Sequence, residues 1–137
     1  MMSSTMMRMA ALAAVLGGLA VAAGAFGAHG LKAVLSPESL AWWKTGAEYH
    51  LVHAIALLAV ALFAAREPDA RSTRAMRVAV AAFVAGIVVF SGSLYVMAAT
   101  GVRALGAVTP FGGVALLVGW GALAFDLWRR ARGPGAG

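Results

Sequence analysis

The chain has 137 residues and no cysteine; hydrophobic side chains make up 62% of it and charged side chains 12%. A soluble domain carries about 25% charged residues, so this composition excludes an ordinary soluble enzyme, a disordered tail and a disulfide-stapled secreted domain. The formal net charge of +6 comes from Lys and Arg that flank apolar runs. There is no basic face with interleaved aromatic residues, so we do not expect nucleic acid as a partner.

Four apolar runs, taken in chain order, are long enough to cross about 30 Å of hydrocarbon as helices. They cover residues 9–28, 46–65, 76–98 and 108–128. The connections are too short for a further globular domain, so we predict one all-α membrane domain over 1–137, an integral membrane four-helix bundle. The first run also matches a signal peptide, because a basic residue precedes it and Ala23-Gly24-Ala25 resembles a cleavage site. Its length favours a membrane span.

The connection between the first two runs carries the signals of a helix start. Ser36 is a suitable N-cap, Pro37 suits the first turn, and Glu38 complements the positive end of a helix dipole. Trp42 and Trp43 follow and suit the depth of lipid headgroups. We therefore predict a short interfacial helix over 37–45, which either stands alone or runs into the second span.

The basic residues are distributed unevenly over the two sides of this four-span arrangement. Eight lie on the side of the termini and the central loop: Arg8, Arg66, Arg71, Arg74, Arg77, Arg129, Arg130 and Arg132. The opposite side has Lys32, Lys44 and Arg103. The positive-inside rule therefore predicts that both termini are cytoplasmic. Anchoring of the helices to anionic lipid is a sufficient role for these charges.

Small residues recur at helical spacing in the first and fourth spans. The two stripes are Ala13, Gly17, Ala20 and Gly24, and Gly112, Ala115, Gly119 and Ala122. Small side chains let helices approach closely in lipid, so we predict a tight antiparallel bundle in which the first and fourth spans are in contact. Either stripe also fits a dimer interface. The glycines expected at helix contacts are Gly17, Gly24, Gly27, Gly86, Gly112, Gly113 and Gly119.

Polar side chains gather in the outer half of the predicted bundle. The candidate cluster is His29, Glu48, Tyr49, His50, His53, Ser91, Ser93, Tyr95 and Thr109. Ionisable groups within a membrane are costly, which makes them candidates for function. On a helical wheel Tyr49, His50 and His53 share one face. Glu48 lies about 140° from His53 and is expected to face another helix, the interface or a subunit.

Three interpretations of this cluster remain open. The favoured one is a structural hydrogen-bond network that fixes the register of the helices. The second is a metal or haem site with His29, His50 and His53 as ligands. The third is a wetted cavity that relays protons or binds a small polar ligand in an oligomer. The sequence has no Gly-rich phosphate loop, HExxH, GxSxG or paired carboxylates, so we predict neither enzymatic activity nor a bound cofactor.

Four motifs in this order resemble those of the bacterial domain-of-unknown-function family 423: GAFGAHGL (24–31), TGAEYHLVHA (45–54), FSGSLY (90–95) and VTPFGG (108–113). The resemblance implies a multi-pass protein of the bacterial inner membrane, related to a mitochondrial transmembrane protein of animals, with no established activity. It also implies glutamine in place of His50 in some members, which leaves His29 and His53 as the candidate ligand pair. We therefore expect a structural or accessory subunit surrounded by lipid, in a homo-oligomer or a larger membrane complex.

The residues that match the family motifs, beyond the candidate cluster, are glycines and one proline. Gly92 between Ser91 and Ser93 favours close helix approach or a local bend. Pro110 lies near the start of the fourth span, where it costs little, because first-turn amides lack helical partners.

Overall fold

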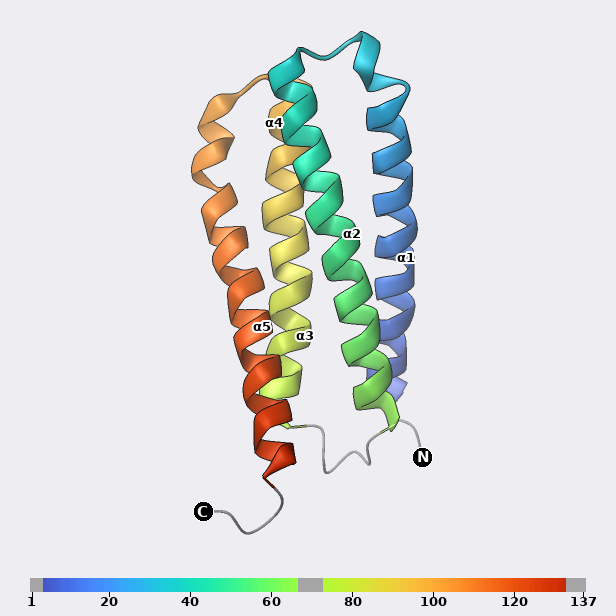
Figure 1. Ribbon diagram of the computed structural model, residues 1–137, viewed down its shortest axis with the longest axis vertical. Helices are drawn as coiled ribbons and strands as arrows, with labels where there is room; N and C mark the ends of the chain where they lie inside the picture. Colours follow the sequence, from blue (N-terminus) through green and yellow to red (C-terminus); the bar gives the residue numbers. More distant parts are fainter. Residues whose placement is uncertain (1–3, 67–72, 133–137) are drawn as a thin grey trace.

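The computed structural model describes residues 4–66 and 73–132, and every long element in that part of the chain is a helix (Figure 1). The elements are α1 (Ser4–Ala28), η1 (Leu31–Ala33), α2 (Pro37–Arg66), α3 (Arg74–Gly86), η3 (Ile87–Ser91), α4 (Gly92–Thr100), η4 (Arg103–Ala107) and α5 (Thr109–Ala131). The segments η1 and η4 are 3-10 turns, and η3 is a π-helical segment. Because η3 joins α3 to α4 without a break, the three form one rod.

The described elements include four helical rods that are long and apolar enough to cross a membrane. The first is α1 with η1, the second is α2, the third is α3–η3–α4, and the fourth is η4 with α5. The predicted all-α four-helix fold is confirmed. The exact limits of the membrane crossings stay a prediction.

The start of α2 follows its local sequence. The Ser36 hydroxyl accepts a hydrogen bond from the backbone N–H of Ser39 at 3.1 Å, which confirms the predicted cap. From Pro37 the helix continues without a break to Arg66. The separate form of the interfacial helix over 37–45 is therefore not confirmed: those residues are the first turns of α2. Glycine costs only about 1 kcal/mol within a helix, and Gly46 is buried against Tyr95, so the helix passes through it.

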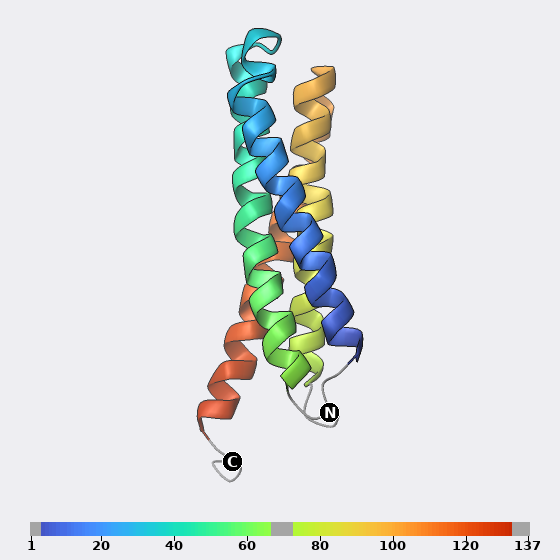
Figure 2. The ribbon, with the colours of Figure 1, turned by 90° about the vertical axis from the view of Figure 1, so that its right-hand side faces the viewer.

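Rods that follow one another in the chain also lie side by side in the bundle. α1 lies along α2, while α5 lies along α3 and η3; α2 also contacts α4 and η3 (Figures 1 and 2). In Figure 1 α1 and α5 stand on opposite sides of the bundle, and in Figure 2 α1 lies in front while α5 lies behind. The predicted contact between the first and fourth spans is therefore wrong. Each small-residue stripe faces the adjacent hairpin partner instead, with Ala13 and Ala20 buried beside α2 and Gly119 against Phe83 of α3.

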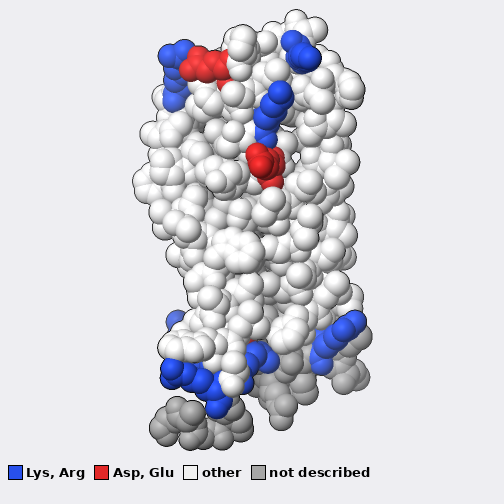
Figure 3. Space-filling view, viewed as in Figure 1, with Lys and Arg blue, Asp and Glu red and all other residues white. Residues whose placement is uncertain are grey.

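The largest apolar contacts lie towards the end of the bundle where α2 finishes, called here the Arg66 end. Leu57, Met76 and Phe83 are fully buried there, and Ala64 and Ala65 complete the contact between α2 and its neighbours. Figure 3 shows charged side chains near both ends of the molecule and a largely uncharged zone between them. An uncharged middle of this kind suits the hydrocarbon of a bilayer.

Candidate functional site

The predicted polar cluster separates into three small sets in the structure, and each set joins two helices. His53 is bonded to Trp120, His50 to Tyr95, and Ser93 to Thr109. The His53–Trp120 pair lies near the middle of α2 and α5, and the His50–Tyr95 and Ser93–Thr109 pairs lie on the half of the bundle where α2 begins, called here the Pro37 end. The pairs link α2 to α5, α2 to α4, and α4 to α5, respectively.

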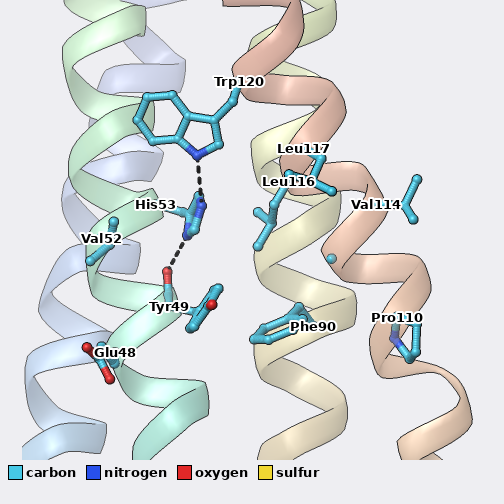
Figure 4. Close-up of a pocket in the computed structure, with 11 residues that line it drawn as sticks. Glu48, Tyr49, Val52, His53, Phe90, Pro110, Val114, Leu116, Leu117 and Trp120 are labelled. Carbon is cyan, nitrogen blue, oxygen red and sulfur yellow. Dashed lines mark hydrogen bonds between the residues drawn. The ribbon is translucent and has the colours of Figure 1, made fainter.

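His53 has a partner for each ring nitrogen, as Figure 4 shows. Its Nδ1 lies 2.7 Å from the backbone carbonyl of Tyr49, one turn earlier in α2. The Trp120 indole donates to its Nε2 at 3.1 Å. A carbonyl only accepts and an indole N–H only donates, so the ring is neutral with its proton on Nδ1. The Nε2 lone pair is thus occupied, and His53 has no free nitrogen for a metal in this arrangement.

His50 contacts the rod that carries α4. Its Nδ1 lies 3.2 Å from the Tyr95 hydroxyl, whereas its Nε2 is buried without a partner among the described residues. The Tyr95 ring reaches this position because Gly46 has no side chain: a Cβ there would stand 3.1 Å from the ring. Trp43 also packs against Tyr95, with ring centroids 4.6 Å apart. Glycine at position 46 therefore positions the His50 partner.

The serine and threonine hydroxyls have separate roles. Ser93 donates to the carbonyl of Phe90 at 2.9 Å and shares a 2.8 Å hydrogen bond with Thr109 at the start of α5. Ser91 is 1% exposed, and its hydroxyl has no partner in the described part of the chain. Of the two serines, only Ser93 thus bonds to a second helix.

A groove of about 690 Å³ lies between α2 and α5, with Phe90 of η3 beside it (Figure 4). We call it the α2–α5 groove. Its walls are mostly apolar, and its polar lining residues are Glu48, Tyr49, His53 and Trp120. A groove of this size and character suits an apolar or amphipathic molecule. It holds no imidazole with a free nitrogen, because Trp120 engages His53.

Two residues of the predicted cluster lie apart from the buried pairs. His29 is exposed just after α1. His53 is about 24 Å along α2 from Pro37, so the structure does not bring it together with His29. Within residues 4–66 and 73–132, no group of three His, Cys, Asp or Glu could hold a metal ion. Glu48 is exposed on α2 and lines the α2–α5 groove, which His53 also lines.

The predicted packing glycines divide by what lies opposite them. A Cβ on Gly86, Gly112 or Gly119 would overlap Leu116, Phe90 or Phe83, respectively, and one on Gly27 would stand 2.6 Å from Trp43. Gly17 and Gly113 have only ordinary contacts at their Cβ positions, and Gly24 has no neighbour within 4 Å. The close approaches are thus concentrated where α5 contacts the third rod, α3–η3–α4, and at Gly27.

A second polar site was missed in the sequence. Asp126 of α5 is 1% exposed and accepts hydrogen bonds from the Thr73 hydroxyl and from Arg130 Nε, the latter at 2.6 Å. Thr73 in turn caps α3 by accepting from the Met76 N–H at 3.1 Å. A threonine before an apolar helical run and an Asp–Arg pair four residues apart are both readable signals. Together these groups fasten the start of α3 to the end of α5.

Trp43 and Trp120 were also not recognised as site residues. The Trp43 indole donates to the carbonyl of Ala23 at 2.8 Å and so joins α2 to α1. A tryptophan in the middle of an apolar run, such as Trp120, is unusual because this residue favours the membrane interface. That position was the available signal for the partner of His53.

The comparisons with known proteins agree with this architecture. The family model described as "Protein of unknown function (DUF423)" matches residues 23–113. The chain is 45% identical over 102 residues to the UPF0382 membrane protein YwdK of Bacillus subtilis, covering 74% of this chain and 80% of that protein. It is 42% identical over 118 residues to a UPF0382 membrane protein of Haemophilus influenzae, covering 86% and 91%.

A third relative is the UPF0382 inner membrane protein YgdD of Escherichia coli, 39% identical over 114 residues and covered to 79% on both sides. No solved structure shows a significant match. The family match covers more than half of the chain, and the relatives align over most of their length. The chain therefore belongs to the DUF423 family of membrane proteins.

Proposed function

We propose that this chain is a structural or accessory subunit of the bacterial inner membrane and has no catalytic role of its own. The observation that carries the proposal is the state of His53. Both of its nitrogens are engaged by Tyr49 and Trp120, so this buried histidine supports helix packing instead of presenting a reactive group. The Ser93–Thr109 bond supports the same interpretation.

A subunit of this kind acts through its surface, which in our proposal meets lipid and a second membrane component. The partner is another copy of the chain or a larger complex. The distribution of Lys and Arg supports an orientation with both termini in the cytoplasm. The Pro37 end, and with it the polar layer, then lies in the periplasmic leaflet.

The experiment that tests this function is purification of the tagged chain from its native membranes at natural expression level. We expect a stoichiometric membrane partner, or a discrete homo-oligomer, to remain bound in mild detergent. A monomer of the chain alone, with a visible absorption spectrum or a stoichiometric metal, would contradict the proposal in favour of a redox component.

The α2–α5 groove favours a second candidate function, the binding of a molecule that is dissolved in the membrane. Its volume of about 690 Å³ lies within the usual range of ligand sites, about 300–1,000 Å³. The groove is largely apolar and has a carboxylate and a phenol on its α2 side, a distribution that suits an amphipathic ligand.

A groove-filling substitution tests this second candidate. Val114 of α5 lines the groove and is 58% exposed. Val114→Trp should therefore displace a bound molecule without disturbing the core. Lipid-extract mass spectrometry of the purified wild type and variant should show one co-purifying species lost from the variant, whereas identical extracts would exclude the candidate.

A further inference from the structure

A second groove lies on the other side of α2, between α2 and α1, with a volume of about 460 Å³. We call it the α1–α2 groove. Its lining is mostly apolar and includes Val21, Trp43 and Leu51. Glu48 lines this groove as well as the α2–α5 groove, and Lys44 lines this one. Two apolar grooves thus flank one helix and share Glu48, and Lys44 lines one of them.

Lys44 and Glu48 are exposed and lie one helical turn apart, about 6 Å along α2. Within residues 4–66 and 73–132, neither forms an ion pair with the other or with another side chain. Glu38 and Arg103 at the same end do pair with each other, at 2.6 Å. Lys44 and Glu48 therefore have free donor and acceptor capacity on the surface.

The depth of this pair matches the level of lipid headgroups. Pro110 and Glu48 both line the α2–α5 groove, and Figure 4 shows them at the same end of it. From Pro110 to Arg130, α5 rises about 30 Å, which equals the thickness of the hydrocarbon. Glu48 then lies at the edge of the hydrocarbon, and Lys44 lies about one turn further out.

We propose that Lys44 and Glu48 bind the headgroup of a phospholipid with a primary ammonium group, and that its two acyl chains occupy the grooves on either side of α2. The Lys44 ammonium pairs with the lipid phosphate, and the Glu48 carboxylate accepts hydrogen bonds from the lipid ammonium. This inference deepens the second candidate function and rests on the α2–α5 groove named there.

The two charges select this headgroup over the other common ones. A choline headgroup has no N–H to donate to Glu48, and a glycerol headgroup has no cation for it. A single-chain amphiphile would fill only one of the two grooves. A lipid with two acyl chains, a phosphate and a primary ammonium fills both grooves and pairs with both Lys44 and Glu48.

The test is native mass spectrometry of the full chain in mild detergent, titrated with lipids of equal acyl chains and ethanolamine, choline or glycerol headgroups. We expect the ethanolamine lipid to be retained about tenfold more than the choline lipid, the ratio at the lower end of what a hydrogen bond to a charged group contributes. Glu48→Gln should abolish this preference, and Lys44→Gln should weaken binding of all three lipids.

The matched control is Glu38→Gln, which removes the same charge at the same end of the bundle but outside both grooves. It should leave the preference unchanged.

Equal retention of the ethanolamine and choline lipids by the wild type would overturn the proposal, as would a preference that survives in folded Glu48→Gln. Val114→Trp gives a second variant with the headgroup site intact, and unaltered lipid retention there would equally contradict it. The isolated chain is used, so failure to find a protein partner does not affect the result.

Discussion

Single hydrogen bonds between distant residues determine how the polar layer of this protein is built. The Trp120 indole and His53 are 67 positions apart in the chain, and their bond joins the middle of α2 to the middle of α5. The helical wheel placed His50 and His53 on one face of the second span, and both are buried. It did not identify their partners, because a wheel describes one helix and contains no information about which face of another helix lies opposite.

Removal of the Trp120 donor should weaken the bundle. Trp120→Phe keeps an aromatic ring beside His53 but leaves Nε2 without its donor. We expect the free energy of unfolding to fall by about 0.5–2 kcal/mol, measured by chemical denaturation in detergent. Trp128→Phe is the control, since Trp128 is 59% exposed and a phenylalanine retains its ring contact with Arg132. Equal losses in the two variants would contradict the role of the bond.

Asp126 provides a second residue-scale prediction at the Arg66 end. Asp126→Asn retains the shape of the side chain but removes the charge that Arg130 contacts, so the free energy of unfolding should fall by about 1–3 kcal/mol. Thr73→Ala removes both the α3 cap and the hydroxyl donor to Asp126. The double variant should show a coupling energy of about 0.5–3 kcal/mol in the same denaturation assay. Simple additivity would show that the two residues act independently.

At the scale of elements, the π segment Ile87–Ser91 sets the faces of the third rod. A π turn contains more residues than an α turn, so an angle computed for a regular helix becomes wrong beyond it. The sequence indicated a close approach or bend at Ser91-Gly92-Ser93 but not the π segment itself. In the structure Tyr95 faces α2 while Ser93 faces α5. The sequence could predict that Ser93 and Tyr95 lie on different faces of one span, because positions two apart on a helix differ by about 200°, but not which neighbour each face meets.

The contact between η3 and α5 requires glycine at one of two adjacent positions. A Cβ on Gly112 would overlap the backbone of Phe90, which cannot move aside as a flexible side chain can. A Cβ on Gly113 would lie 3.8 Å from the Phe90 ring, an ordinary contact. Gly112→Ala should therefore lower the free energy of unfolding by about 1–3 kcal/mol, and Gly113→Ala should change it little. Circular dichroism during thermal unfolding distinguishes the two, and equal melting temperatures would contradict the predicted close approach.

For the whole molecule, length and hydropathy were sufficient to predict four membrane-spanning rods, because the hydrocarbon sets a minimum apolar length. They were not sufficient to predict the pairing. Lipid is as apolar as the helices, so association depends on detailed shape and a few polar bonds. The stripes on α1 and α5 both predicted close packing, yet each stripe is matched by the neighbour in its own hairpin. A stripe shows that a helix has a contact face but does not identify the helix that fills it.

Orientation is the prediction that belongs to the whole molecule. Because the chain has no cysteine, single cysteines can report each side without a background. Cysteines at Leu35 and Arg103 should react in intact spheroplasts with a maleimide that does not cross membranes, because both positions lie at the Pro37 end. A cysteine at Arg74, which is exposed at the opposite end, should react only after the membrane is permeabilised. The reverse pattern would place the Lys- and Arg-rich end outside and would move the polar layer, both grooves and the Lys44–Glu48 pair to the cytoplasmic leaflet.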